Sequence, residues 1–173
     1  MIIPKLVITD IDGVWTDGGM YYDENGGEWK KFNTSDSAGI LFLRLLKIPS
    51  CIMTGEQSNA VKRRAEKLKV DFLYLGAKNK LQLARELCKS LNVSLTDVAF
   101  IGDDINDLEL LKQVGISASP FNAPNYIKKH VSFITNKKGG EGAFREFIET
   151  ILQKNNLMEK ALELYFKEKE FKQ

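Results

Sequence analysis

The sequence predicts an α/β fold in which helices cover both faces of a doubly wound parallel sheet. Two observations indicate this fold: short apolar runs alternate with longer helical patterns, and a polar residue or a glycine follows several of the apolar runs directly. The chain has 173 residues, 43% of them hydrophobic, which is enough for one core. No repeat, low-complexity tract or linker divides it, so we expect residues 1–173 to form a single domain.

The expected strands are short apolar runs and the expected helices are segments with apolar residues at helical spacing. In chain order the strands cover Lys5 to Asp10, Pro49 to Met53, Asp71 to Leu75, Val98 to Ile101, Ile116 to Ala118 and Val131 to Ile134. The helices cover Ser37 to Lys47, Ser58 to Lys69, Asn79 to Leu91, Asp107 to Val114, Pro124 to Lys129 and Gly142 to Gln153. This alternation favours parallel pairing of the strands.

Two segments fall outside the alternation. Residues 19–32 contain two aromatic-rich runs around Asn25-Gly26-Gly27, a pattern typical of a β-hairpin. An isolated hairpin is marginally stable in water, so its aromatics need cover, either from the chain's own core or from another subunit. Residues 156–173 carry apolar side chains at helical spacing and predict a C-terminal helical tail.

The composition argues against several classes of partner. A net charge of +2 provides no electrostatic footprint for nucleic acid or for an acidic membrane. The N-terminus has no hydrophobic signal core, and no apolar run approaches the length of a membrane span. We therefore expect a cytoplasmic protein that binds neither nucleic acid nor membrane.

Two acidic clusters follow expected strands. Asp10 and Asp12 end the first strand and lead into a glycine turn, and Asp103, Asp104 and Asp107 follow the fourth strand. A turn explains the first cluster alone, whereas a solvated loop or the start of a helix explains only one or two of the three acids in the second. If the two strands are neighbours in one parallel sheet, however, their carboxylates converge on one crevice, where a divalent cation would relieve the repulsion. The pattern predicts a Mg²⁺ site.

Two further residues suggest that a phosphoryl group is handled at the same edge of the sheet. Thr54 follows the second expected strand, where its hydroxyl can either bond a phosphate oxygen or cap the next helix. Lys80 lies in the first turn of an expected helix, where the helix macrodipole disfavours a cation. That placement suggests an anionic partner, either a phosphoryl group or a carboxylate.

The order of these residues resembles the four signature motifs of the haloacid dehalogenase superfamily of phosphatases. The motifs are Asp-x-Asp, Thr, Lys and Gly-Asp-Asp-x-x-Asp, each after an expected strand, within residues 6–107. The resemblance implies that Asp10 is a nucleophile that forms an aspartyl-phosphate and that Asp12 is the general acid and base. It also implies that Thr54 and Lys80 bind the phosphoryl group.

The resemblance further implies a metal site with Mg²⁺ as the cofactor. Its ligands would be Asp10, the backbone carbonyl of Asp12, and Asp103. Asp104 and Asp107 have several open roles around this site, which are ligation through water, orientation of Lys80 or support of the ligands.

The hairpin insert is too short to form a separate cap domain, so the chain resembles the capless branch of the superfamily. Members of this branch assemble as tetramers through such hairpins and complete each active site with residues of a neighbour. The resemblance therefore implies a homotetramer with shared active sites and a small phosphorylated sugar acid as substrate. The residues expected to bind the substrate are Thr34, Thr54, Gly55, Glu56, Arg64, Lys67, Lys80 and Asn106.

The capless branch includes phosphatases of 3-deoxy-D-manno-octulosonate 8-phosphate and of 2-keto-3-deoxynononate 9-phosphate. Residues 13–18 and 31–40 resemble the nononate enzymes, and Glu56 stands where octulosonate phosphatases commonly carry Arg. A carboxylate there would repel the substrate's own carboxylate unless cations such as Arg64 and Lys67 flank it, although both also fit a solvated helix face. We expect 2-keto-3-deoxynononate 9-phosphate or a sialic acid 9-phosphate as substrate, with octulosonate 8-phosphate as the alternative.

A phospho-accepting receiver domain is the rival interpretation from outside the enzymes. Receivers also gather aspartates, a Thr and a Lys at the carboxyl edge of a parallel sheet. The order of the motifs counts against this class, because receivers take the phosphoryl group on an Asp after a later strand. Here the first strand carries Asp10 together with Asp12, whose carboxylate would speed loss of the phosphoryl group.

Overall fold

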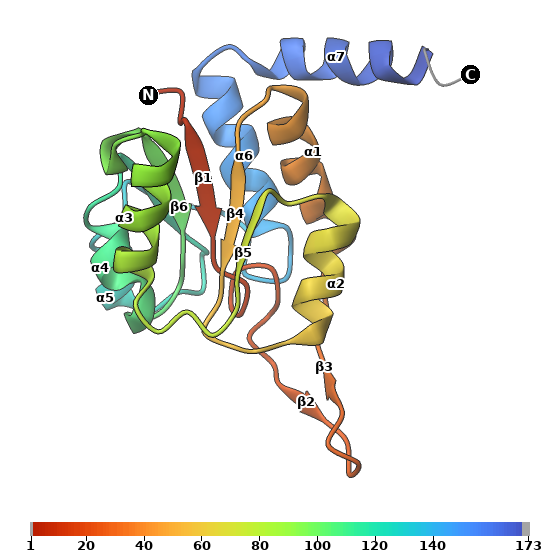
Figure 1. Ribbon diagram of the computed structural model, residues 1–173, viewed down its shortest axis with the longest axis vertical. Coiled ribbons are helices and arrows are strands. Elements are labelled where there is room, and N and C mark those ends of the chain that lie inside the picture. Colours follow the sequence, from red (N-terminus) through yellow and green to blue (C-terminus); the bar gives the residue numbers. More distant parts are fainter. Residues whose placement is uncertain (1, 171–173) are drawn as a thin grey trace.

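The computed structural model describes residues 2–170 and contains a six-stranded parallel sheet with the order β5-β4-β1-β6-β7-β8 (Figure 1). The strands are β1 (Leu6–Thr9), β4 (Ser50–Met53), β5 (Phe72–Tyr74), β6 (Val98–Ile101), β7 (Ile116–Ser119) and β8 (Phe133–Ile134). Strand β1 lies between β4 and β6, with Thr9 opposite both Ile52 and Ile101. The predicted α/β fold with a parallel sheet is confirmed.

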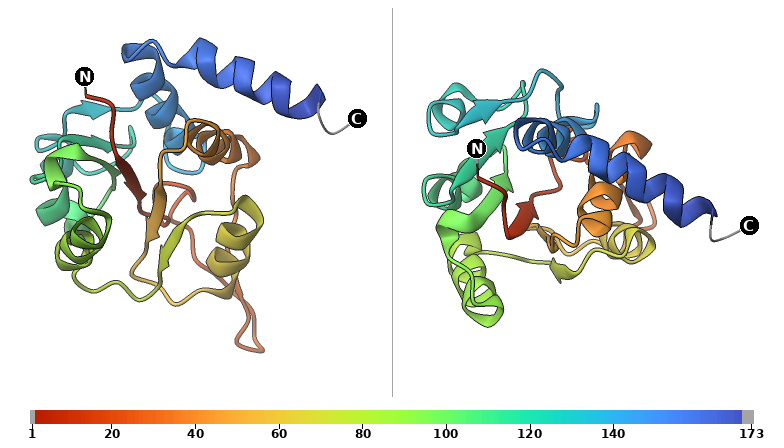
Figure 2. Two further views of the ribbon diagram at one scale, coloured as in Figure 1. Left: turned by 45° about the horizontal axis from the view of Figure 1, so that its top comes forward. Right: turned by 90° about the horizontal axis from the view of Figure 1, so that it is seen from above.

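Helices cover both faces of this sheet (Figures 1 and 2). On one face, α1, α2, α6 and the start of α7 pack against Val7, Ile52 and Ala99. On the other face, α3, α4 and α5 pack against Ile8 and Phe100. The bounds are α1 (Ser37–Leu45), α2 (Asn59–Leu68), α3 (Lys80–Leu91), α4 (Leu108–Leu111), α5 (Asn125–Lys128), α6 (Ala143–Lys154) and α7 (Met158–Glu170), with single 3₁₀ turns η1 (Thr34–Asp36), η2 (Leu95–Asp97) and η3 (Ile105–Asp107).

The segment after β6 differs from its prediction. Residues 107–114 were expected to form one helix, whereas the chain makes the 3₁₀ turn η3 and then only the four-residue helix α4. The Asp104 carboxylate accepts a hydrogen bond from the backbone N of Ile105, and the backbone N of Asp107 donates to the Asp104 carbonyl. This tight turn leaves the buried Asp107 carboxylate beside the end of β6, where it takes part in the site described below.

The predicted hairpin is present as β2 (Tyr21–Tyr22) paired antiparallel with β3 (Glu28–Trp29), and it projects from the body of the molecule (Figure 1). At its tip, the Asp23 carboxylate accepts hydrogen bonds from the backbone N of Asn25 and of Gly27. Tyr22 and Trp29 are 69% and 65% exposed. The hairpin therefore presents aromatic side chains to solvent in this single chain.

The C-terminal tail forms the helix α7 as far as Glu170, and the predicted positions 171–173 lie outside the described residues. Ala161 anchors its first half in the core, while Leu162 and Phe166 are exposed along it. Figure 2 shows α7 reaching past the end of α6 and α1. Within residues 2–170, no helix combines the length and the apolar character needed to cross a membrane.

A buried aspartate fixes the start of α6. Asp36 is fully buried, and its Oδ1 accepts a hydrogen bond of 2.9 Å from the backbone N of Arg145. Burial raises the pKa of Asp36 from 3.8 to about 6, against the opposing effects of that hydrogen bond and of the Arg64 and Arg145 charges. Because the pKa is higher in the folded chain than in the unfolded chain, this group lowers stability progressively as the pH rises from about 4 to about 6.

We predict that Asp36→Asn stabilises the protein above pH 6, because the amide keeps the acceptor for Arg145 and removes the buried charge. The gain in unfolding free energy should be about 2–3 kcal/mol at pH 7.5 and smaller at pH 5, where the folded wild type already holds the proton. Urea unfolding of wild type and variant at both pH values measures this difference. A gain that is equal at the two pH values, or a loss at pH 7.5, would contradict the prediction.

Candidate active site

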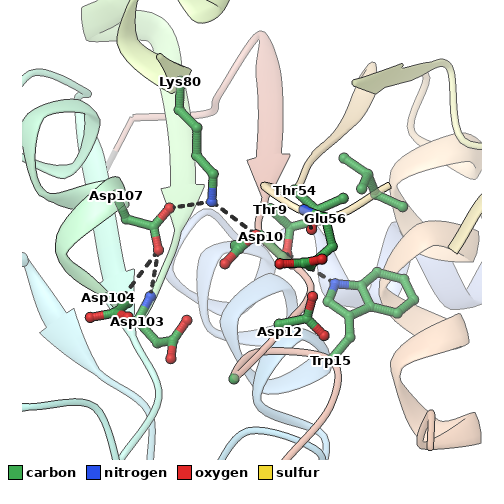
Figure 3. A network of polar contacts seen from close by, with 12 residues as sticks. Thr9, Asp10, Asp12, Trp15, Thr54, Glu56, Lys80, Asp103, Asp104 and Asp107 are labelled. Atoms are coloured by element: carbon green, nitrogen blue, oxygen red, sulfur yellow. Dashed lines mark hydrogen bonds and ion pairs between the residues drawn. The ribbon is translucent and has the colours of Figure 1, made fainter. Parts of the chain in front are cut away.

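The carboxyl ends of β1, β4 and β6 meet at a cleft with a volume of about 280 Å³ (Figure 3). Asp10 follows β1, Thr54 follows β4 and Asp103 follows β6, and parallel pairing brings these three ends to one edge of the sheet. Of the residues predicted for the site, the cleft is lined by Asp10, Asp12, Thr54, Gly55, Glu56, Asp103, Asp104 and Asn106.

Lys80 lies buried beside the cleft and joins the two acidic clusters. Its Nζ is 2.9 Å from Oδ1 of Asp10 and 2.6 Å from Oδ1 of Asp107 (Figure 3). Burial lowers the pKa of Lys80, but the two carboxylates outweigh that effect and raise it above its ordinary value. Lys80 was expected to need an anionic partner at the start of α3, and it has two carboxylate partners. It therefore places a fixed positive charge next to Asp10.

Asp107 is held from both sides. Its Oδ1 accepts from Lys80, and its Oδ2 accepts hydrogen bonds from the backbone N of Asp103 at 2.9 Å and of Asp104 at 3.2 Å. A side chain at Gly102 would overlap the Asp107 carboxylate, so only glycine fits this position. Of the roles left open for Asp107, this geometry matches orientation of Lys80.

The carboxylates at the cleft carry more negative charge than Lys80 neutralises. Burial, followed by the nearby charge of Asp107, raises the pKa of Asp10 to about 7, although Lys80 opposes the shift. Burial and the charges of Asp10, Asp107 and Asp104 raise the pKa of Asp103 to about 8. Both shifts have the same physical cause, which is carboxylates crowded into a partly dehydrated volume.

The donor set fits a hard divalent cation. One carboxylate oxygen from each of Asp10, Asp103 and Asp107 lies within 4.8 Å of the other two, a grouping found among the described residues. Oδ1 of Asp103 is buried and has no hydrogen-bond partner in that part of the chain. Both oxygens of Asp107 already accept hydrogen bonds, so Asp10 and Asp103 are the carboxylates best placed to coordinate Mg²⁺.

The loop after β1, which carries Asp12 and Gly13, approaches Asp103 very closely. Gly13 has φ +85°, and a Cβ at this position would overlap the Asp103 carboxylate. The glycine-rich loop before α6 packs against this loop. The backbone N of Gly140 donates to the Val14 carbonyl, and a side chain at Gly139 would overlap the Gly13 carbonyl. The glycine-rich segment near the C-terminus therefore braces the loop that carries Asp12.

Asp12 lines the cleft and is held through one of its two oxygens. Its Oδ1 accepts hydrogen bonds from Nζ of Lys30 at 2.8 Å and from the Thr16 hydroxyl at 3.4 Å. Its Oδ2 is buried without a hydrogen-bond partner among the described residues. Lys30 was not among the residues predicted for the site. The alternation of a strand puts Lys30 and Lys31 on opposite sides, but nothing in that pattern identifies Asp12 as a partner.

Thr54 and Asp104 occupy opposite sides of the cleft. Thr54 is 1% exposed, and its Oγ1 accepts a hydrogen bond from the backbone N of Glu56 at 3.3 Å. That arrangement leaves the hydroxyl hydrogen free to donate into the cleft. The Asp104 carboxylate accepts from the Tyr126 hydroxyl at 3.0 Å as well as from the backbone N of Ile105, contacts that fix it at the rim.

Three residues predicted to bind the substrate lie away from the cleft of their own chain. Thr34 and Lys67 line a separate pocket formed by residues of η1, α1, α2 and α6. Arg64 donates to the Ser37 hydroxyl at 2.9 Å and to the Asn33 carbonyl at 3.4 Å. The structure thus brings together the residues predicted for catalysis and for the metal, but not these three.

The fold and the cleft define a class of hydrolase with an aspartate pair and a cation site at the carboxyl edge of a parallel sheet. Residues 70–147 match the model of the haloacid dehalogenase-like hydrolases. The 3-deoxy-D-manno-octulosonate 8-phosphate phosphatase KdsC of Haemophilus influenzae is 38% identical over 149 residues, which cover 86% of this chain and 83% of that protein. This chain belongs to the haloacid dehalogenase-like hydrolase family, and the predicted resemblance to this superfamily is confirmed. The predicted resemblance to the nononate enzymes within it stays a prediction.

Solved structures support the same assignment. A probable YrbI family phosphatase from Pseudomonas syringae superposes with a TM-score of 0.91 at 38% identity, covering 95% of this chain and 93% of that one. The 3-deoxy-D-manno-octulosonate 8-phosphate phosphatase of Moraxella catarrhalis superposes with a TM-score of 0.88 at 35% identity, covering 94% and 93%. The latter crystal structure contains a magnesium ion, a phosphate ion and a KDO molecule.

We predict that Asp103→Asn has opposite effects on stability with and without metal. In EDTA the variant should be more stable than wild type, by about 1–3 kcal/mol, because one of the crowded carboxylates is removed. In excess Mg²⁺ the wild type should gain stability and the variant should gain little, because a ligand is lost. Urea unfolding measures both effects.

The matched control for this prediction is Glu163→Gln, which removes one carboxylate from an exposed position in the middle of α7. It should leave both the stability in EDTA and the response to Mg²⁺ unchanged. An Asp103→Asn variant that is less stable than wild type in EDTA, or that responds to Mg²⁺ as wild type does, would count against this cation site.

Proposed function

We propose that this protein is a Mg²⁺-dependent phosphatase that hydrolyses the phosphate monoester of a 2-keto-3-deoxy sugar acid through an aspartyl-phosphate. The observation that carries the proposal is the meeting of Asp10, Asp12 and Asp103 at one cleft, with the buried cation of Lys80 against Asp10. The sugar acid class is supported by the names of the relatives.

In the first half of the reaction, a carboxylate oxygen of Asp10 attacks phosphorus and the bond from phosphorus to the sugar oxygen breaks. Lys80 reduces the charge repulsion between the Asp10 carboxylate and the phosphate. Asp12 donates its proton to the departing sugar oxygen. Asp10, Asp103 and the backbone carbonyl of Asp12 would hold a Mg²⁺ ion, which would further neutralise the charge of the phosphoryl oxygens.

In the second half, a water molecule attacks the phosphorus of the aspartyl-phosphate. Asp12, now a carboxylate, takes a proton from this water, and the bond between phosphorus and the Asp10 oxygen breaks. Inorganic phosphate leaves, and both aspartates return to their starting forms. The Thr54 hydroxyl, free to donate into the cleft, holds a phosphoryl oxygen through both halves.

The choice of sugar rests on Glu56, which lines the cleft. Its carboxylate disfavours an acid whose own carboxylate lies close to the phosphate. A nine-carbon acid phosphorylated at its end has one more carbon between the two groups than an eight-carbon acid. We therefore favour 2-keto-3-deoxynononate 9-phosphate or a sialic acid 9-phosphate, while the names of the relatives support octulosonate 8-phosphate as the alternative.

A panel of sugar acid phosphates tests both the activity and this choice. We predict release of phosphate over many turnovers, with kcat/KM at least about tenfold higher for the nine-carbon acids, a difference of about 1.4 kcal/mol in transition-state binding. Glu56→Arg should shift the preference toward the eight-carbon acid, and Asp10→Asn should release no phosphate. Stoichiometric phosphorylation without turnover would indicate a receiver-like module instead.

A homotetramer with shared active sites is the second part of the proposal. The cations expected to flank Glu56 are Arg64 and Lys67, and neither lines the cleft of its own chain. Lys67 is exposed and so is free to reach a neighbouring molecule. The hairpin, with Tyr22 and Trp29 largely exposed, offers an aromatic surface for subunit contact.

We predict that two inactive variants restore activity when they are coexpressed. Asp10→Asn has no nucleophile but supplies Arg64 and Lys67, whereas Arg64→Gln/Lys67→Gln supplies the nucleophile. In mixed oligomers some clefts receive intact parts from both chains, so kcat/KM should exceed that of either parent several-fold. Light scattering should give four times the 19.6 kDa chain mass. A monomer, or no recovery in the mixture, would refute shared sites.

A further inference from the structure

The base of the hairpin contributes a covered lysine to the active site. The side chain of Lys30, one residue after β3, has no solvent exposure, although the residue as a whole is half-buried through its backbone. Its Nζ donates to Oδ1 of Asp12 at 2.8 Å and is 3.2 Å from Oε1 of Glu28. The neighbouring Lys31 has a side chain that is 71% exposed and lies 3.6 Å from Asp17.

Covering an ammonium group is unfavourable unless the group is paired. Lys30 satisfies this condition with two carboxylates, which outweigh its burial and keep its pKa above the ordinary value. Glu28 and Lys30 are two residues apart and so point to the same side of the strand. The hairpin thus directs a preformed Glu28–Lys30 pair toward Asp12.

This contact decides which oxygen of Asp12 is available. Oδ1 is occupied by Lys30 and by the Thr16 hydroxyl. Oδ2 is buried in the same region and has no hydrogen-bond partner among the described residues. Because Asp12 lines the cleft, a proton that it transfers must be carried by Oδ2, and the Lys30 contact prevents the carboxyl group from turning over.

We infer that Lys30 is a positioning residue for proton transfer: it holds Oδ1 of Asp12 so that Oδ2 faces the leaving oxygen of the substrate and later the attacking water. The inference rests on the proposed function. It assigns the hairpin a part in the chemistry of its own chain, in addition to any part in subunit contact. The competing explanation is that the ion pair only anchors the hairpin.

The dependence on the leaving group separates these explanations. A sugar alcohol needs a proton in order to leave, whereas the phenolate of p-nitrophenyl phosphate leaves as a stable anion. In Lys30→Met, kcat/KM should fall at least about tenfold for the sugar acid phosphate and less than about threefold for p-nitrophenyl phosphate. The matched control Lys31→Met makes the same charge change on the exposed neighbour and should alter neither substrate.

A double variant gives the second readout. If Lys30 acts through Asp12, adding Lys30→Met to Asp12→Asn should change kcat/KM by less than about twofold. If the ion pair only anchors the hairpin, Lys30→Met should slow both substrates equally and its loss should multiply that of Asp12→Asn. Either of these results would overturn the inference.

A second variant and the activity of the wild type distinguish a folding defect from a failure of either hypothesis. If Lys30→Met does not fold by circular dichroism, Lys30→Gln retains a hydrogen-bond donor without the charge, and the same difference between substrates is expected. A wild type that releases no phosphate from any ester would refute the proposed function itself. A wild type that is active beside a Lys30→Met variant with an unchanged ratio between the two substrates would refute only the role of Lys30.

Discussion

The crowding of carboxylates at one edge of the sheet is the constraint around which this molecule is organised. Asp10, Asp103 and Asp107 are forced together by the pairing of β1 with β6, and burial raises the pKa of the first two toward neutrality. Lys80 offsets part of this repulsion by contacting Asp10 and Asp107, and a divalent cation would offset the rest. In the metal-free protein, the repulsion between these carboxylates lowers the free energy of unfolding. Such a loss is common where a site is arranged to bind a cation and an anionic substrate.

The surrounding loops hold this arrangement in place through backbone contacts. Gly13 and Gly102 allow close approach to Asp103 and Asp107, where any side chain would collide with a carboxylate. The glycine-rich loop before α6 then supports the loop of Gly13 from the outer side. These contacts join segments that are far apart in the chain, so the position of the carboxylates in the cleft depends on folding well beyond the loops that carry them.

The residues predicted for catalysis lie apart from two of the residues predicted to bind the sugar. The predicted nucleophile, acid and metal ligands lie in one cleft, whereas neither Arg64 nor Lys67 lines that cleft. Within residues 2–170 no separate cap domain is present, and the hairpin projects from the end of the molecule toward which β1 runs (Figure 1). In the proposed assembly the hairpin would have two roles: its exposed aromatic residues would contact another subunit, and Lys30 at its base would hold Asp12.

The sequence alone was sufficient for the parallel sheet, the hairpin and the convergence of the acidic clusters, because each depends on local periodicity and on the rule that parallel strands end at one edge. It also indicated that Lys80 needs an anionic partner. Only the tertiary structure decided that this partner is a pair of carboxylates, that Asp107 holds Lys80, that Lys30 reaches Asp12 and that α4 is a single short turn. Those contacts join residues far apart in the chain, and their geometry follows from packing, which no local pattern encodes.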